Sequence, residues 1–386
     1  MKEYRLGDII DIKHGYAFDG DHIVQEDNGI VLVTPGNFRI GGGFQEEKCK
    51  FFTGEIPDDY VLSAGDFIVT MTDLSKEIDT LGYSAIVPDT NRTYLHNQRI
   101  GLVSFKNNEC HPGYIYFLMR THQYQRSIAN TSTGATVHHT SPSKICDYQF
   151  YAPSYEKQRR IAEYLFVYEK LTENNQKQIK LLEEAAQRLY KEWFIDLHFP
   201  GHEITPIVDG VPAGWKKVEV GTCIAKVART KQVMTAELLE VGKIPVVDQS
   251  RNFIAGYTND EETVVDLGIP IIVFGDHTRV LKYIQFPFAK GADGTQLIVT
   301  TNEKMPQSLL YCSLVNVDLS NYHYARHFKY LKAEEILLPS LDVAHQFDGV
   351  VSPLFEQVQM LRDKCKLAAE ARDRLLPKLM SGEIEV

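Results

Sequence analysis

The chain has 386 residues, enough for more than one hydrophobic core, and its 44% hydrophobic and 24% charged residues are typical of a soluble globular protein. The net charge of −10 by itself argues against a nucleic-acid-binding protein, because phosphate neutralisation dominates that affinity. The six cysteines are scattered without a CxxC pair, and no apolar run reaches membrane-spanning length. We therefore expect a cytoplasmic protein with no membrane contact, no disulfide framework and no metal cluster.

The first block, residues 1–152, is rich in short β-like runs between turn signals. A short helix is expected from about residue 114, and the polar segment 130–143 is too rich in Ser, Thr and Gly to be a packed element. The candidate strands are residues 29–34, 67–71, 83–87 and 100–105. These features predict a β-rich domain.

A long helix is expected over residues 153–198. Ser154 is a suitable N-cap residue, and the sequence Phe199-Pro200-Gly201 ends the helix and opens a linker at 199–210. At about 1.5 Å per residue this helix would be a rod of roughly 60 Å. A second block, residues 211–338, then repeats the style of the first. Its candidate strands are residues 244–247, 263–265, 269–274 and 296–299.

A second long helix, residues 339–386, is a copy of the first. Residues 153–195 and 339–381 align without a gap, and Pro377 is expected to kink or end the second helix near Leu376. The identical pairs are Pro153/Pro339, Ser154/Ser340, Lys180/Lys366, Leu181/Leu367, Glu184/Glu370, Ala185/Ala371, Arg188/Arg374 and Leu189/Leu375. The chain therefore reads as a duplicated half-unit with pseudo-twofold symmetry.

Both copies carry a mostly apolar seam with 4-3 spacing, the period that two helices need in order to pack along their length. The alternative is that each helix packs only on its own neighbouring domain. The predicted interface residues are Ile161, Leu165, Ile179, Leu182, Leu189, Phe347, Val351, Leu354, Val358, Leu361 and Leu375. The predicted fold is α+β, with two β-rich domains joined by two long helices packed as an antiparallel coiled coil.

Polar and basic side chains gather in loops of both blocks. Arg suits guanine, Asn and Gln suit adenine, and Lys, Ser and Thr suit phosphates, so these loops are candidates for DNA contact. The candidates are Lys76, Asn97, Gln98, Arg99, Ser132, His138, His139 and Lys144 in the first block, and Arg229, Lys231, Gln249, Arg251, Asn252, His277, Thr278, Arg279, Tyr322, Tyr324, Arg326, His327 and Lys329 in the second. For each of them the alternative is a solvated loop residue, and segment 322–329 could instead anchor its block to the second helix.

The sequence offers no catalytic constellation. It contains no Pro-Pro, which the target-binding motif of amino-methyltransferases requires, and it has no glycine fingerprint, P-loop or HExxH spacing. Glu46-Glu47-Lys48 lacks the upstream acidic partner of a nuclease site. We therefore expect no catalytic residue and no metal site in this chain.

Several strings in a fixed order resemble the specificity (S) subunit of type I restriction–modification enzymes. They are residues 6–9 (LGDI), 158–162 (QRRIA), 193–196 (WFID), 211–215 (VPAGW), 273–279 (VFGDHTR) and 375–382 (LLPKLMSG). Together they cover nearly the whole chain.

The resemblance implies that residues 1–152 and 211–338 are target recognition domains, each reading one half of a split sequence in double-stranded DNA. Residues 153–198 and 339–386 would be the spacer helices. The chain would be non-catalytic and hold no cofactor, whereas two methyltransferase subunits and the restriction/translocase subunits would supply S-adenosylmethionine, ATP and Mg binding. The alternatives are a specificity subunit of a type II-like enzyme and a coiled-coil scaffold that binds only proteins.

Overall fold

The structure is a computed structural model that describes residues 1–386 except 76–77, 135, 226, 229 and 323–325. Contacts divide the chain into two compact units. Unit 1 comprises Met1–Thr172 and Leu367–Val386, and unit 2 comprises Glu173–Lys366. The predicted DNA-binding residues Lys76, Arg229 and Tyr324 lie outside the described residues.

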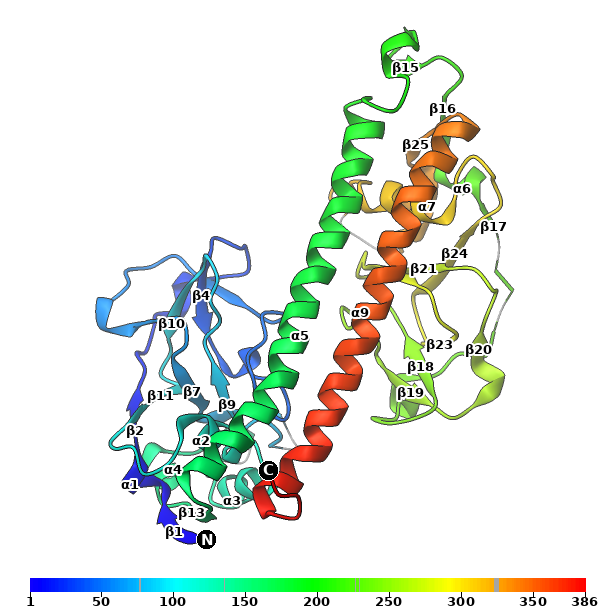
Figure 1. Ribbon diagram of the computed structural model, residues 1–386. Helices are drawn as coiled ribbons and strands as arrows, with labels where there is room; N and C mark the ends of the chain where they lie inside the picture. The colour runs from blue at the N-terminus through cyan, green and yellow to red at the C-terminus, as the bar shows by residue number, and fades with distance from the viewer. Residues whose placement is uncertain (76–77, 135, 226, 229, 323–325) are drawn as a thin grey trace. The chain divides into compact units, whose positions relative to one another are not determined.

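Two long helices, α5 (Tyr155–Tyr190) and α9 (Leu341–Ser381), each contribute to both units (Figure 1). A π-helical turn, Lys191–Ile195, follows α5. Within unit 1 Glu169 of α5 pairs with Arg372 of α9 at 3.3 Å, and within unit 2 Glu183 pairs with Arg362 at 2.6 Å. The residue number rises along α5 while it falls along α9, so the predicted antiparallel helix pair is confirmed.

The prediction that the second helix kinks or ends near Leu376 is wrong on its end point, because α9 continues to Ser381. Pro377 lies in the last turns of the helix and is exposed. Water can therefore solvate the backbone carbonyl that loses its amide donor, and few residues follow whose packing the proline ring could disturb.

The seam residues turn inward in both helices, and none of them is exposed. In unit 1 Ile161 and Leu165 of α5 join Leu376 and Leu379 of α9 in one core with the β-rich domain. In unit 2 the core holds α5, α9 and α7 residues together. Each helix therefore packs on a domain as well as on the other helix. The buried seam residues are Ile161, Leu165, Phe347, Val351, Val358 and Leu361, and the half-buried ones are Ile179, Leu182, Leu189, Leu354 and Leu375.

The β-rich domain of unit 1 contains two main sheets. The first has the order β2 (Ile10–His14), β11 (Ile100–Phe105), β7 (Phe67–Thr70), β9 (Ser84–Ile86). The second has the order β3 (Ile23–Val24), β5 (Lys50–Phe52), β4 (Ile30–Val33), β10 (Thr93–His96), β6 (Val61–Leu62). Two short pairs are β1 (Lys2–Arg5) with β13 (Gln149–Ala152), and β8 (Thr72–Asp73) with β12 (His138–His139). The helices are α1 (Leu6–Ile9), α2 (Pro112–Leu118), α3 (His122–Asn130) and α4 (Pro142–Cys146).

Strand β7 shows why these residues form a buried sheet. Val69 joins the core that contains α2 and the long helices, whereas Ile68 joins a second core with Val31 and Tyr94 of the other sheet. Both faces of the strand are covered, which explains its continuous apolar run without polar alternation.

The β-rich domain of unit 2 is built in the same way. One sheet has the order β17 (Ile224–Ala225), β24 (Thr295–Thr300), β21 (Ile271–Gly275), β22 (Leu281–Ile284), and the other has the order β19 (Gly256–Thr258), β18 (Ile244–Val247), β23 (Phe288–Lys290), β20 (Val264–Val265). The remaining pairs are β16 (Lys216–Glu219) with β25 (Glu335–Leu338), and β14 (Ile207–Val208) with β15 (Val211–Pro212). The helices are α6 (Val220–Cys223), α7 (Gln307–Val315) and α8 (Phe328–Ala333).

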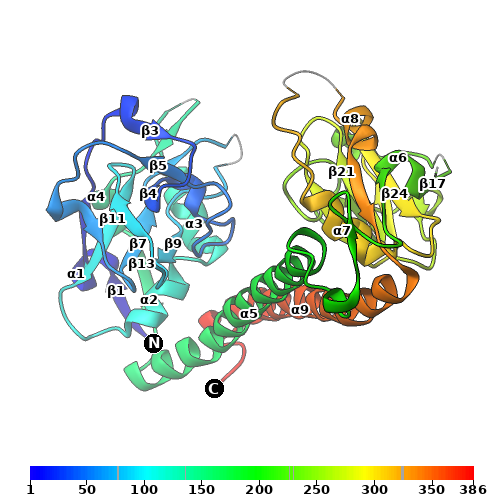
Figure 2. The same cartoon turned by 90° about the horizontal axis from the view of Figure 1, so that it is seen from above.

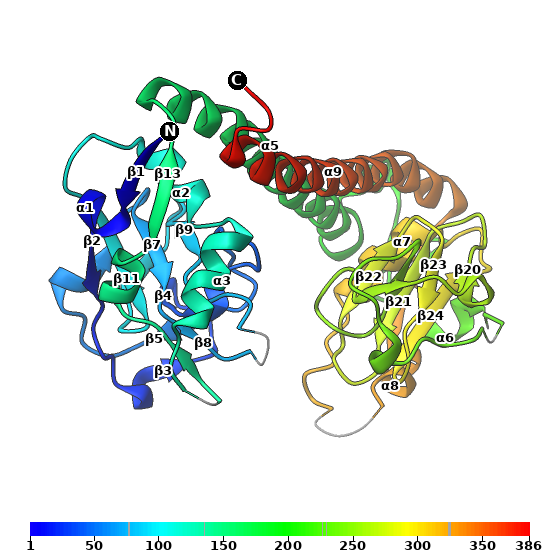
Figure 3. The ribbon, with the colours of Figure 1, turned by 90° about the horizontal axis from the view of Figure 1, so that it is seen from below.

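The two domains share one topology. The order β2-β11-β7-β9 matches β17-β24-β21-β22, and both second sheets contain a single parallel pair, β4 with β10 and β18 with β23. Strand β8 in unit 1 and helix α8 in unit 2 lie at the end of their own domain that faces away from its long helices (Figures 2 and 3).

Candidate nucleic-acid interface

The backbone of Met71 joins two predicted loops of unit 1. The Met71 amide donates to the carbonyl of Arg99 at 2.9 Å, and the Met71 carbonyl accepts from the amide of Thr140 at 3.0 Å. The turn 97–99 and the segment around His139 are therefore neighbours. Within the turn, the buried Asn97 accepts from the amide of Arg99 at 3.0 Å, so its side chain shapes the turn while Gln98 and Arg99 remain exposed.

The second of these loops is a small hairpin. Thr133 and His139 exchange backbone hydrogen bonds, and strand β12 pairs with β8. One ring nitrogen of His139, Nδ1, lies 3.1 Å from the hydroxyl of Thr72. Lys144 donates to the carbonyl of Thr131 at the base of the hairpin. The hairpin is therefore held by its pairing with β8, by the contact between His139 and Thr72, and by the hydrogen bond from Lys144.

Asp73 organises the loop that follows β8. Its carboxylate accepts from the amide of Ser75 and from both the amide and the hydroxyl of Thr80, each at 2.6 Å, although the residue is only 1% exposed. Burial alone would raise the pKa of Asp73, but these hydrogen bonds outweigh it and lower the pKa. A buried carboxylate therefore holds Ser75 and Thr80, which flank the candidate Lys76 in the sequence.

Gln249 plays the corresponding linking role in unit 2. Its side-chain amide donates to the carbonyl of Asp293 at 3.0 Å and accepts from the amide of His277 at 3.1 Å. Its backbone carbonyl accepts from the hydroxyl of Thr278 at 2.6 Å. Gly294 has a φ of +71°, and a Cβ there would lie 2.7 Å from His277 and 2.8 Å from Gln249. Only glycine fits this junction without strain.

Asp276 directly follows β21 and, like Asp73, is buried. Its carboxylate accepts from the amide of Phe328 at 2.8 Å. The ring of His327 lies 2.9 Å from the Asp276 carbonyl and 3.0 Å from the Tyr322 carbonyl. His327 is 5% exposed, so its side chain joins backbone segments inside the domain.

Arg279 and Tyr322 complete this junction. Arg279 adopts a φ of +62° and donates to the Tyr322 carbonyl at 2.9 Å. The Tyr322 ring stacks on Tyr330 with centroids 4.1 Å apart, and its hydroxyl bonds Glu334 at 3.1 Å. This described part of segment 322–329 is anchored to α8, while Arg326 and Lys329 point outward as exposed residues.

The predicted DNA-binding residues fall into three groups by exposure. Lys231 is exposed but lies 2.6 Å from Asp260 and 3.5 Å from Glu262, so its charge is already compensated. The exposed residues are Gln98, Arg99, His139, Lys231, Arg251, Asn252, His277, Thr278, Arg279, Arg326 and Lys329. The half-buried ones are Ser132, His138, Lys144, Gln249 and Tyr322, and the buried ones are Asn97 and His327.

Sequence reasoning missed the residue that supports the 248–252 loop. Lys282 of β22 is 4% exposed, and its ammonium donates to the carbonyls of Asp248 at 2.8 Å and Asn252 at 2.5 Å. The sequence feature that could have indicated this residue is a single lysine in the otherwise apolar strand LKYI.

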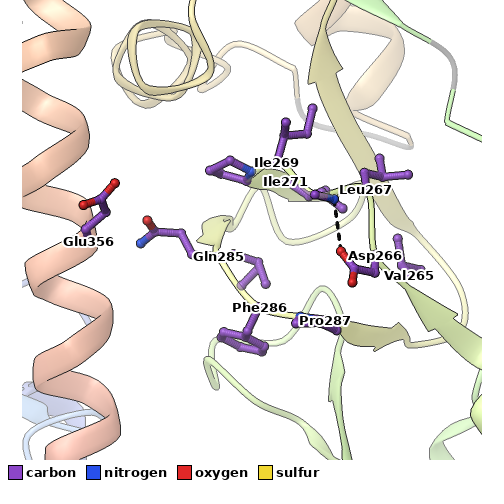
Figure 4. Close-up of a pocket in the computed structure, with 12 residues that line it drawn as sticks. Val265, Asp266, Leu267, Ile269, Ile271, Gln285, Phe286, Pro287 and Glu356 are labelled. Carbon is purple, nitrogen blue, oxygen red and sulfur yellow. Dashed lines mark hydrogen bonds between the residues drawn. The ribbon is translucent and has the colours of Figure 1, made fainter.

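The described part of unit 2 contains at least two hollows. One of about 360 Å³ is lined by residues 265–271 and 284–287 and by Glu356, which extends from α9 toward Gln285 (Figure 4). No predicted DNA-binding residue lines it. The other, of about 830 Å³, is bordered by Arg251 and Lys282 and by cationic residues of the long helices, including Lys180 and Arg188.

Within the described ranges, no group of His, Cys, Asp and Glu side chains is placed to hold a metal ion. Among the described residues, no helix has both the length and the apolar composition that a membrane-spanning helix needs.

The two β-rich domains thus carry polar loops on one repeated frame. Residues 1–184 match the family model described as the Type I restriction modification DNA specificity domain. The predicted resemblance to the specificity subunits of type I restriction–modification systems is therefore confirmed.

One curated protein and one solved structure are similar to this chain over most of its length. The chain is 27% identical over 302 residues to the Type I restriction enzyme MjaIX specificity subunit of Methanocaldococcus jannaschii, covering 71% of this chain and 69% of that protein. The crystal structure of the type I restriction-modification S subunit from M. genitalium aligns with a TM-score of 0.56 at 15% identity, over 98% of this chain and 95% of that one. This structural likeness confirms the predicted fold.

Proposed function

We propose that this chain reads an asymmetric, bipartite DNA target. Residues 1–152 would read one half and residues 211–338 the other, with 153–198 and 339–386 as spacer helices and 199–210 as a linker. The repeated sheet order carries this proposal, because one frame is built twice with different loops. The turn after β10 is Asn97-Gln98-Arg99, whereas the turn after the equivalent strand β23, residues 291–294, is Gly-Ala-Asp-Gly. Different side chains on one frame read different bases.

The proposal includes partners because this chain is acidic. A net charge of −10 leaves few uncompensated cations for phosphate, so other subunits would supply much of the sequence-independent affinity. The partners we propose are two methyltransferase subunits and the restriction/translocase subunits, which would bind S-adenosylmethionine, ATP and Mg, in the cytoplasm.

A repeated exposed leucine supports the binding of two methyltransferase subunits. Leu181 is 64% exposed and Leu367, its equivalent in the second copy, is 63% exposed. Lys180 and Lys366, which precede them, are exposed as well. A single exposed leucine needs no explanation, but the same leucine at the same helical position in both copies indicates a surface that binds the same kind of partner twice.

Exchange of residues 211–338 for the corresponding block of another specificity subunit tests the division between the domains. The methylated sequence should then change in one half-site only, and exchange of residues 1–152 should change the other half-site. If both halves change together in either exchange, the proposal of two independent readers fails.

A further inference from the structure

Lys282 occupies an unusual place in the second domain. It lies on β22, and the ammonium group of its nearly fully buried side chain is 3.7 Å from the carboxylate of Asp248. Its two hydrogen bonds go to the carbonyls of Asp248 and Asn252, the first and last residues of the loop 248–252. The lysine therefore joins the two ends of this loop.

The rest of the loop is fixed as firmly. The Asp248 carboxylate accepts from the amide of Ser250 at 2.9 Å and from its hydroxyl at 2.6 Å. Gln249 connects the loop to residues 277, 278 and 293. Against this fixed backbone, Arg251 and Asn252 remain exposed. These two side-chain types make the efficient contacts to guanine and adenine in the major groove.

We propose that Lys282 is the positioning residue for the second half-site, since it holds loop 248–252 so that Arg251 and Asn252 meet the DNA. This inference rests on the proposed function. Base-reading side chains must be held to within about 0.5 Å of their productive geometry, so a loop without its internal support would discriminate poorly between bases.

Stability alone does not account for a lysine at this position. Burial lowers the pKa of Lys282 to about 8, which means that the domain holds the ammonium against its preference for water. An apolar side chain would fit the strand LKYI at a lower desolvation cost. The hydrogen bonds to the loop are what an apolar side chain cannot supply.

The test uses the assembled methyltransferase containing Lys282→Met, with Lys304→Met as a matched control because Lys304 is an exposed lysine of the same domain. Methylation rates are measured on duplexes in which each target position is substituted in turn. For Lys282→Met, discrimination should fall at least tenfold at positions of one half-site and stay unchanged at the other. Lys304→Met should behave as the unsubstituted enzyme, and Lys282→Arg should retain discrimination because a guanidinium can still donate to both carbonyls.

A folded Lys282→Met enzyme with unchanged discrimination at both half-sites would overturn the inference. If that variant does not fold, Ser250→Ala removes one hydrogen bond within the loop. Relaxed discrimination at the same single half-site would then support the inference, and unchanged discrimination would overturn it. Failure of the proposed function appears separately, as the absence of a two-part target for the unsubstituted enzyme.

Discussion

Glu169 of α5 joins the first domain to both long helices. Its carboxylate accepts hydrogen bonds from Arg120, from the hydroxyl of Tyr116 at 3.0 Å and from Arg372 of α9 at 3.3 Å. Arg120 also donates to the carbonyls of Gly41 and Gly42 in the first domain. Glu169→Gln removes the carboxylate that forms an ion pair with Arg120, without changing the size of the side chain.

The magnitude follows from burial. The Arg120 side chain is 1% exposed and that of Glu169 is 20% exposed, so water cannot replace the lost charge. Removal of one partner from a buried ion pair costs about 3–5 kcal/mol. For a unit of this size that loss lowers the unfolding temperature by roughly 10 °C. Glu163→Gln on the same helix is the control, because its pair with Arg159 is exposed and therefore weakened by solvent.

Thermal unfolding and urea unfolding of both variants measure these losses. Unfolding of the first domain should shift strongly in Glu169→Gln and barely in Glu163→Gln. Equal, small shifts in the two variants would refute the argument that this carboxylate joins the domain to both helices.

Three further predictions concern binding and pH. Leu181→Asp and Leu367→Asp should each weaken methyltransferase binding at least tenfold by equilibrium titration with thermal stability unchanged, and unaltered affinity would exclude this surface. Arg326→Ala should relax one target position at a cost of about 1–3 kcal/mol, whereas Lys329→Ala should weaken all sequences alike and reduce the salt slope of binding by about one. The folded-state pKa of Lys282, about 8, lies below the ordinary 10.5, so the unfolded chain binds the extra proton between these values. The free energy of unfolding should therefore rise with pH across this window, by up to about 3 kcal/mol, and the difference from Lys282→Met measured in parallel should show that rise.

The long helices and the main strands could be predicted because their signals are local and repeated. The 4-3 seam persists over many turns in two copies, and residues 100–105 and 244–247 form strands with the predicted bounds. Strands such as β10 and β22 escaped prediction because each contains a polar residue, His96 or Lys282, that tertiary contacts bury.

The candidate interface could be predicted only as a set of loops. Residue type indicated which side chains suit DNA, but exposure depends on backbone carbonyls that lie far away in sequence. His327 is buried because the carbonyls of Asp276 and Tyr322 converge on its ring. Lys282 is buried because loop 248–252, which lies more than thirty residues earlier at Asp248, packs on its side chain. The hydrogen bond from Lys282 to the Asp248 carbonyl shows this contact. Neither arrangement leaves a periodic trace in the sequence.

The sequence of the methylated DNA in cells that contain this chain and its methyltransferase partner tests the central claim most directly. Two domains with one frame and different loops predict two short, non-identical half-sites separated by a fixed number of unread base pairs. A single contiguous target, or a perfectly symmetric one, would contradict the account.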